Sequence, residues 1–335
     1  MSATIPARLF RVKHLVLGTQ IRHVLSGLAC LALIGCEAVP PAPTTTPQPR
    51  PAGLVPPKPK PTAPQAPSAA SLDLARYYGR VQADLLNRGL LRVDGGGVDT
   101  PYTQRNLMTN FEQIAFYDEY SQAGGFQRSD GVAGGLRKWT KPVRMAVEFG
   151  ASVPKAQRQS DAASVAKYAG RLARVTRHPI TVSPGNANFF VLVMGEDDRD
   201  QLLTRIKQIE PGVDATTLSM IRNLPRSIHC VVAAFAAKDD GYVYNRAVAV
   251  IRAEHPELTR RACIHEELAQ GLGLANDSPR ARPSIFNDDD EFALLTTHDE
   301  ELLRTLYDPA LKPGMSLEEA RPVVTRILAA RLGPS

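Results

Sequence analysis

The chain has 335 residues, of which 43% are hydrophobic and 22% charged, a composition that excludes collagen-like, coiled-coil and wholly disordered proteins. Its formal net charge of +6 comes from the first 70 residues: residues 1–35 carry four basic side chains and no acidic one, residues 36–70 carry a net +2, and residues 71–335 are neutral overall. A neutral body lacks the basic field that drives phosphate binding, so we expect no nucleic-acid partner.

Residues 1–35 have the pattern of an export signal. A basic stretch precedes an apolar run over 24–34, which is shorter than the roughly 20 residues that span a bilayer. The string Leu-Ile-Gly-Cys at 33–36 resembles the lipobox of bacterial lipoproteins, whose cysteine thiol accepts a diacylglyceryl group. The resemblance implies lipidation at Cys36 and a membrane attachment through the lipid. Because Glu37 stands where an Asp would resemble an inner-membrane retention signal, we expect an outer-membrane lipoprotein that faces the periplasm.

The next segment, residues 36–70, is predicted to be a tether. It holds 12 prolines, with Thr, Ala, Gln and Lys between them. Such a composition cannot bury a core and favours extended polyproline II of about 3 Å per residue, or on the order of 100 Å at full stretch. The segment would hold the folded domain away from the membrane. A plain secretory signal or a membrane-anchoring helix upstream of it is the alternative to the lipid anchor.

The cysteines agree with export. Cys30 would leave with the signal and Cys36 would carry the lipid, so Cys230 and Cys263 are the only pair left in the mature chain. In the oxidising periplasm these two are expected to form a disulfide. Two buried thiols in the reduced state are the alternative, because the sequence gives no distance between them.

Residues 71–335 are predicted to form one domain. Its parts are a helical N-terminal part (71–125), a part with the sheet and a long helix (136–312) and a C-terminal helix (316–332). The expected strands are 143–149, 189–194, 230–236 and 242–251, and the expected helices are 71–88, 106–120, 160–176, 197–209 and 256–272. Helices interleaved with strands predict an α+β or layered α/β fold in which helices cover a mixed sheet.

The predicted helix over 256–272 carries the residues with the most chemistry. Its apolar residues lie four apart and should face the core: Ile264, Leu268 and Leu272. Glu266 and Gln270 form an i, i+4 pair on another face, and Glu267 lies beside the first of them. A helix presents metal ligands and a general base in this arrangement.

These residues carry a resemblance. The string Glu-Glu-x-x-Gln-x-x-Gly-x-x-Asn at 266–276 is similar to the metzincin pattern His-Glu-x-x-His-x-x-Gly-x-x-His, with all three histidines replaced. Ser-Ile-Phe at 284–286 resembles the metzincin Met-turn, and 297–307 resembles the closing helix, begun by a capping box of Thr297 and Glu300. As a whole, residues 71–320 resemble the bacterial domain-of-unknown-function 2927 family of exported proteins. The resemblance implies a zincin-like fold, in which a mixed twisted sheet packs on the long helix and a cleft separates that helix from an edge strand.

The resemblance places Glu266, Gln270 and Asn276 at the three metal-ligand positions. Zinc favours imidazole and thiolate ligands, so these oxygens would make a weak site, which harder divalent cations such as magnesium or calcium would accept. Reading the motif from His265 does not restore it, because Ala269 would then stand at the second histidine. Three neighbours could complete an unusual site: His265, Asp277 and His298.

Two functions are consistent with this pattern, and a third possibility is that Glu266 and Glu267 are structural residues, hydrogen-bonded under the sheet. The first is a lipid-anchored periplasmic protein whose degenerate site is retained as a non-catalytic module that binds peptides or envelope proteins. The second is an atypical metal-dependent peptidase or hydrolase in which Glu267 is the general base. In both, an extended peptide is expected to add as a strand to the edge strand beside the long helix. We expect that strand to be 242–251 rather than 231–236.

Overall fold

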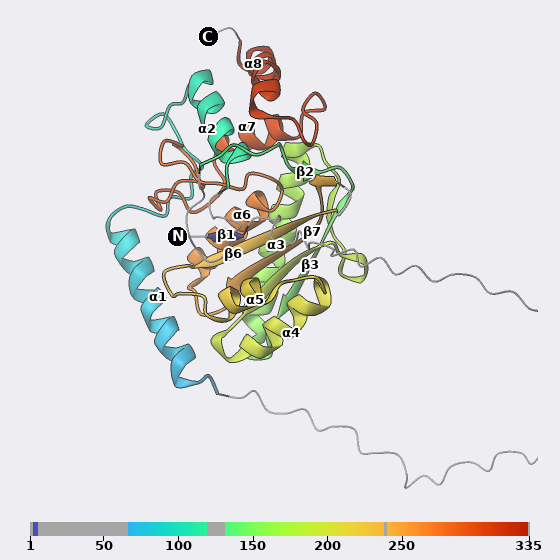
Figure 1. Ribbon diagram of the computed structural model, residues 1–335. Coiled ribbons are helices and arrows are strands. Elements are labelled where there is room, and N and C mark those ends of the chain that lie inside the picture. The colour runs from blue at the N-terminus through green and yellow to red at the C-terminus, as the bar shows by residue number, and fades with distance from the viewer. Residues whose placement is uncertain (1–2, 6–65, 119–130, 238–239, 334–335) are drawn as a thin grey trace, which may run out of the picture. The chain divides into compact units, whose positions relative to one another are not determined.

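Seven strands form one mixed sheet in the part of the chain that the computed structural model describes, residues 3–5, 66–118, 131–237 and 240–333 (Figure 1). The strands are β1 (Ala3–Ile5), β2 (Lys138–Trp139), β3 (Val143–Phe149), β4 (Ile180–Val182), β5 (Phe189–Met194), β6 (Cys230–Ala237) and β7 (Asp240–Arg252). Their order is β1-β6-β7-β5-β3-β4, and β2 also pairs with β7. β6 is antiparallel to β7, and the other pairings are parallel.

Eight α-helices accompany the sheet in the described residues. They are α1 (Ala69–Asn87), α2 (Gln104–Phe116), α3 (Lys155–Thr176), α4 (Arg199–Ile209), α5 (Ala215–Arg222), α6 (Glu257–Gln270), α7 (Thr297–Leu306) and α8 (Leu317–Leu332). The predicted mixed α/β fold with a helical N-terminal part is confirmed. The expected signal peptide, most of the tether and Cys36 lie outside the described residues, apart from β1.

Both faces of the sheet are apolar and covered by helices. On β5, Phe189, Val191 and Val193 face the core that α3 and α6 complete, whereas Leu192 and Met194 face the core that α4 and α5 complete. Side chains of a strand alternate between its faces, and a strand buried on both sides reads as a continuous apolar run. This explains why the sequence Phe-Phe-Val-Leu-Val-Met predicts a buried strand.

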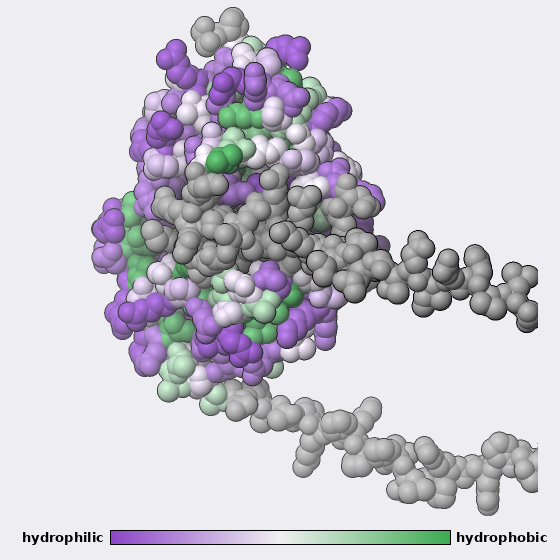
Figure 2. Space-filling view, in the orientation of Figure 1, coloured by the Kyte–Doolittle hydropathy of each residue, from purple (hydrophilic) through white to green (hydrophobic). Residues whose placement is uncertain are grey.

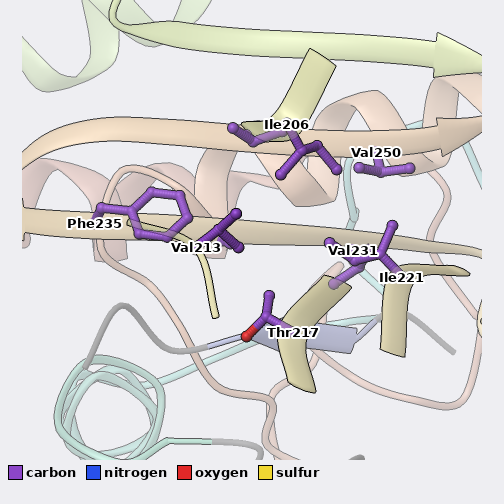
Figure 3. A pocket seen from close by; sticks show the side chains of 9 residues that line it. Ile206, Val213, Thr217, Ile221, Val231, Phe235 and Val250 are labelled. Carbon is purple, nitrogen blue, oxygen red and sulfur yellow. The ribbon is translucent and has the colours of Figure 1, made fainter. Parts of the chain in front are cut away.

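A small apolar gap lies between the α4 and α5 layer and the sheet (Figure 3). Ile206 of α4 and Ile221 of α5 reach it from the helices, and Val231 and Phe235 of β6 form part of its floor. The hydroxyl of Thr217 is the polar group among the nine lining side chains. The gap offers no acid, base or nucleophile, so it does not compete with the residues of α6 as a chemical site.

The position of β7 corrects one expectation. β7 lies between β6 and β5 and is hydrogen-bonded on both sides, so it cannot be the edge strand. β6 lies next to the edge instead, and on its outer side it carries β1, with Ala3 opposite Val231 and Ile5 opposite Ala233. The order of strands depends on contacts between distant segments, which the local pattern of 242–251 does not contain.

Among the described residues, the length and hydropathy of the helices decide whether one could cross a bilayer. None of these helices is both long and apolar enough to do so. On the face drawn in Figure 2, the described residues are mostly hydrophilic, with hydrophobic residues in small separate patches.

A disulfide joins β6 to α6. Cys230, the first residue of β6, is bonded to Cys263 in the middle of α6, and their Cα atoms lie 5.8 Å apart. Both residues are buried. The predicted pairing is therefore confirmed, and it connects the strand near the edge to the helix that carries the motif.

Removing this crosslink should destabilise the domain. The two cysteines are 33 positions apart, and in the chain-entropy model a loop of that length stabilises the fold by about 3 to 4 kcal/mol. We expect the double variant Cys230→Ala/Cys263→Ala to lose this amount of unfolding free energy in a urea titration, as should the reduced wild type. Equal urea midpoints for oxidised wild type and double variant, or two reactive thiols at these positions in the denatured unreduced protein, would contradict the crosslink.

Candidate functional site

The first half of α6 is held by polar contacts from two other helices. Pro256 supplies no side-chain cap, and instead Gln82 of α1 accepts hydrogen bonds from the backbone N–H and the hydroxyl of Thr259, at 3.1 and 2.9 Å. At the next residue, the guanidinium of Arg260 binds the carboxylate of Asp161 on α3 at 3.0 to 3.1 Å. Both groups of this ion pair are buried, so removal of either one would leave a charge in an apolar region.

The end of α6 requires glycine at two positions. A Cβ atom on Gly271 would lie 2.6 Å from the ring of Phe189, and its carbonyl accepts a hydrogen bond of 2.9 Å from the indole of Trp139. Gly273 has a φ of +128°, and a Cβ there would lie 2.4 Å from the carbonyl oxygen of Arg137. Side chains rarely adopt this backbone conformation, so glycine permits the sharp turn that follows the helix.

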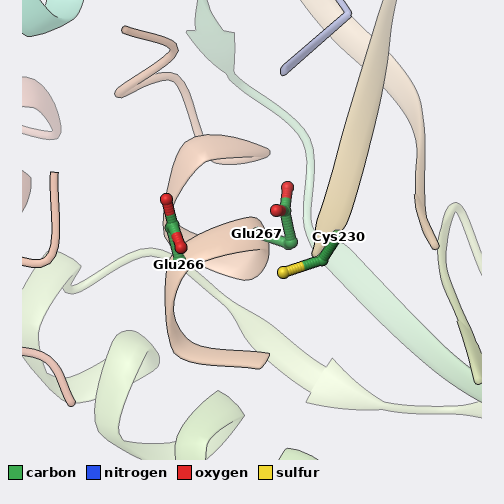
Figure 4. Close-up of side chains that lie close together, drawn as sticks. All are labelled: Cys230, Glu266 and Glu267. Atoms are coloured by element: carbon green, nitrogen blue, oxygen red, sulfur yellow. The ribbon is translucent and has the colours of Figure 1, made fainter. Parts of the chain in front are cut away.

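The two carboxylates of the motif lie near the start of β6. One oxygen each of Glu266 and Glu267 and the sulfur of Cys230 all lie within 4.8 Å of one another (Figure 4). Glu267 is fully buried, and Glu266 is half-buried. The apolar residues predicted to face the core do so: Ile264 and Leu268 of α6, and Leu272 just after its end. The helical spacing thus separates a packing face from an acidic face.

The other predicted ligands have hydrogen-bonding partners of their own. The amide nitrogen of Gln270 donates to Asp277 at 3.3 Å. The amide nitrogen of Asn276 donates to the carbonyl of Gln113 at 2.9 Å, and its backbone N–H donates to Ile114 at 3.1 Å, so Asn276 attaches its loop to α2.

This donor set does not fit the zinc centre that the metzincin resemblance implies. Glu266 would be the one charged ligand, and Gln270 and Asn276 would add only neutral amide oxygens. The set contains no imidazole or thiolate, the ligands that zinc prefers. We therefore derive no reaction step through a metal at these three residues, whose assignment as ligands stays a prediction.

His265 has a packing role in the structure. Its Nδ1 accepts a hydrogen bond of 3.0 Å from the backbone N–H of Leu295. Its ring stacks on Tyr168, with centroids 3.9 Å apart, and the Tyr168 hydroxyl donates to the His265 carbonyl at 2.8 Å. Burial, with Arg171 nearby, lowers the pKa of His265 to about 3, so the ring is neutral at pH 7.

The sequence did not predict a buried hydrogen-bond network around Asp299 at the start of α7. Asp299 accepts hydrogen bonds from the hydroxyl of Ser284 at 2.5 Å, the backbone N–H of Ile285 at 3.1 Å and Thr296. His298 lies beside Asp299, and its Nε2 is 3.0 Å from the amide of Asn110.

These groups hold the segment 284–286 against the start of α7. Although a serine, a histidine and an aspartate meet here, the serine bonds to the aspartate rather than to the histidine, and all three are at most 1% exposed. A nucleophilic triad requires the serine–histidine bond and access for a substrate. The cluster is therefore structural.

The helix cap differs by one residue from the prediction. Thr296, not Thr297, is the N-cap of α7, and its capping-box partner is Asp299, not Glu300. Glu300 instead pairs with Arg171 of α3 and with Arg304.

Glu266 also borders an open pocket of about 390 Å³ on α6. Asn287, Asp288 and Asp290 line it together with Glu266, and the other lining residues are apolar. The charged groups on this wall are all acidic, so a ligand that entered the pocket would need a cationic or hydrogen-donating group.

One comparison with known proteins gives a match. A protein-family model described as "Protein of unknown function (DUF2927)" matches residues 104–326, about two thirds of the chain. The matched region runs from the start of α2 into α8 and includes Cys230 and the motif residues of α6, but not Gln82 of α1. No curated protein matches the chain, and no solved structure does.

The low pKa of the partly buried His265 predicts that the protein becomes less stable in acid. Its pKa is about 6.5 in the unfolded chain and about 3 in the folded one, so below pH 6.5 the unfolded state binds the proton first. Unfolding free energy should therefore decrease by about 2 kcal/mol between pH 8 and pH 5 through this residue. Buried His255, whose pKa is also lowered by burial, adds to the decrease.

The matched variant is His265→Asn, whose amide oxygen can accept from Leu295 but does not titrate. Urea titrations at pH 8 and pH 5 should show a decrease that is smaller by about 2 kcal/mol than in wild type. An unchanged difference between the two pH values would show that His265 is not the titrating group.

Proposed function

The chain belongs to the DUF2927 family, and we propose that it is a lipid-anchored, non-catalytic module of the bacterial cell envelope that binds extended peptides along the outer side of β6. The observation that carries this proposal is the pairing of β1 with β6 beside the acidic face of α6. An edge that pairs with one extended segment has backbone groups arranged to pair with another.

β1 comes from the part of the chain that the expected signal cleavage would remove. Residues 3–5 lie within the expected signal peptide, so cleavage before Cys36 would remove them from the mature protein. The outer side of β6 would then be available to a different extended segment. Backbone hydrogen bonds would supply most of the affinity, and side chains on alternate residues would supply the selectivity.

Charge supports a preference among peptides. Glu266 and Glu267 lie within 4.8 Å of Cys230, the first residue of β6. A lysine or arginine at the matching position of a peptide would be attracted by these carboxylates, and an acidic residue there would be repelled. We therefore propose that the bound peptides carry a basic residue near the start of β6.

The hydrolase alternative has less support from the geometry. It requires Glu267 to activate a water held by a metal on Glu266, Gln270 and Asn276. Those three residues offer one carboxylate and two neutral amide oxygens, so the set lacks a strong zinc ligand. A binding role uses the same strand and helix without that metal.

Strand addition can be tested by changing only the peptide. We expect the signal-cleaved protein to bind extended lysine-containing peptides in a fluorescence anisotropy assay. N-methylation of one peptide residue at a time should weaken binding about 3- to 10-fold at every second position, because alternate N–H groups point at β6. Equal effects at all positions, or no binding to any extended peptide, would contradict strand addition.

The same assay tests the acidic face. Glu267→Gln should reduce the preference for a central lysine over a central glutamate, whereas Glu257→Gln, exposed in the first turn of α6, should leave it unchanged. Peptide cleavage that is lost in Glu267→Gln and in the presence of a chelator would overturn the non-catalytic proposal in favour of the hydrolase.

Anchoring depends on the thiol of Cys36. In Cys36→Ser no acyl group can be attached, so the protein should move from the membrane fraction to the soluble fraction. Mass spectrometry of the wild type should find the acyl chains on Cys36. A variant that stays in the membrane fraction, together with a wild type that carries no acyl mass, would refute the lipid anchor.

A further inference from the structure

We propose that reduction of the Cys230–Cys263 disulfide creates a zinc site whose ligands are the two cysteine thiolates and the carboxylates of Glu266 and Glu267. The sulfur of Cys230 and one oxygen of each carboxylate already lie within 4.8 Å of one another (Figure 4). Zinc bonds of 2.0 to 2.3 Å in a tetrahedron place ligand atoms about 3.6 Å apart. Side-chain rotations that move each ligand atom by roughly 1 Å would therefore bring these atoms to a common ion.

Cys263 adjoins this group of residues along α6. It precedes Glu266 by three positions and Glu267 by four on α6, so the three side chains are neighbours across one helical turn. Its sulfur is bonded to that of Cys230 but is not among the three atoms that lie within 4.8 Å of one another, so it would reach the ion by side-chain rotation once the disulfide is reduced. The four residues supply two soft sulfur donors and two anionic oxygens, which is a donor set that zinc accepts.

The oxidised protein lacks the key ligands. A disulfide sulfur carries no charge, and it is the thiolate that binds zinc. A dithiol reductant would transfer two electrons and two protons to the S–S bond, so that both protein thiols form and the dithiol becomes a disulfide. Zinc binding then displaces the two thiol protons, and the charge of the ion offsets the thiolates and carboxylates.

The frame around the site does not depend on the disulfide alone. The ion pair of Arg260 with Asp161 and the cap from Gln82 hold α6, and β6 is held by its antiparallel pairing with β7. Opening the S–S bond would thus leave the sulfur of Cys230 next to the carboxylates and Cys263 one helical turn from them on α6. This site differs in its ligands from the one at Glu266, Gln270 and Asn276, and it does not depend on peptide binding at β6.

The experiment compares metal binding by the oxidised and reduced full chain carrying Cys30→Ser and Cys36→Ser, so that no other thiol contributes. After reduction by a dithiol and its anaerobic removal, the chain is equilibrated with Zn²⁺ and desalted, and the metal is measured by elemental analysis. We expect about one zinc per reduced chain and none per oxidised chain. With Co²⁺, the reduced chain should show thiolate-to-cobalt charge-transfer absorption.

The variants distinguish zinc binding by all four side chains from zinc binding by the two thiolates without the carboxylates. Glu266→Gln/Glu267→Gln should weaken zinc binding by the reduced chain at least tenfold, whereas Glu257→Gln should bind like the parent. Far-UV circular dichroism of the reduced chain checks that the comparison is made on folded protein. Equal metal content before and after reduction, cobalt binding without thiolate absorption, or zinc affinity that is unchanged in the double Glu→Gln variant would each overturn the proposal.

Discussion

The bond between Cys230 and Cys263 closes a covalent ring through β6, β7 and α6, and together with the contacts that hold each element it fixes β6 beside the helix of the candidate site. The chain passes from β6 into the antiparallel β7, from β7 into α6, and the disulfide returns it to the start of β6. Because side chains alternate along a strand, a bond from Cys230 to α6 also selects which face of β6 turns to that helix. Val232 and Ala234 accordingly face the α6 side, and Val231 and Ala233 face α4 and α5.

Much of this fold could be predicted from the sequence because its strands and long helices have strong local patterns. The apolar runs at 189–194 and 230–236 lie within one residue of the observed β5 and β6. The short elements β4 and α5 were missed, since three and eight residues carry too little periodicity to stand out. The position of β7 inside the sheet is set by its pairing with β5, about fifty residues earlier in the chain, and no local pattern contains that information.

The site was predicted less completely than the fold. Helical spacing alone brings Glu266 and Glu267 to the acidic face of α6. The roles of His265 and Asn276 depend on a backbone N–H at Leu295 and a carbonyl at Gln113, which are distant in sequence. The cap of α7 is a different kind of case, because two successive threonines each precede an acidic residue by three positions. Local capping rules fit both, and the tertiary hydrogen bonds of Asp299 favour the first.

The contact between Gln82 and the start of α6 bears on where the functional unit begins. α1 lies outside the region that the family shares, residues 104–326, yet its Gln82 satisfies a backbone donor of the helix that carries the motif. Leu85 of α1 and Leu258 of α6 also belong to one apolar cluster. A recombinant fragment that begins at residue 104 would lack this cap and would expose the apolar residues that α1 covers next to the site. The smallest unit in which α1 still supports this site therefore starts near residue 68, some thirty-five residues before the region that the family model matches. Relatives that lack such a helix would need another group to cap the first turn of α6.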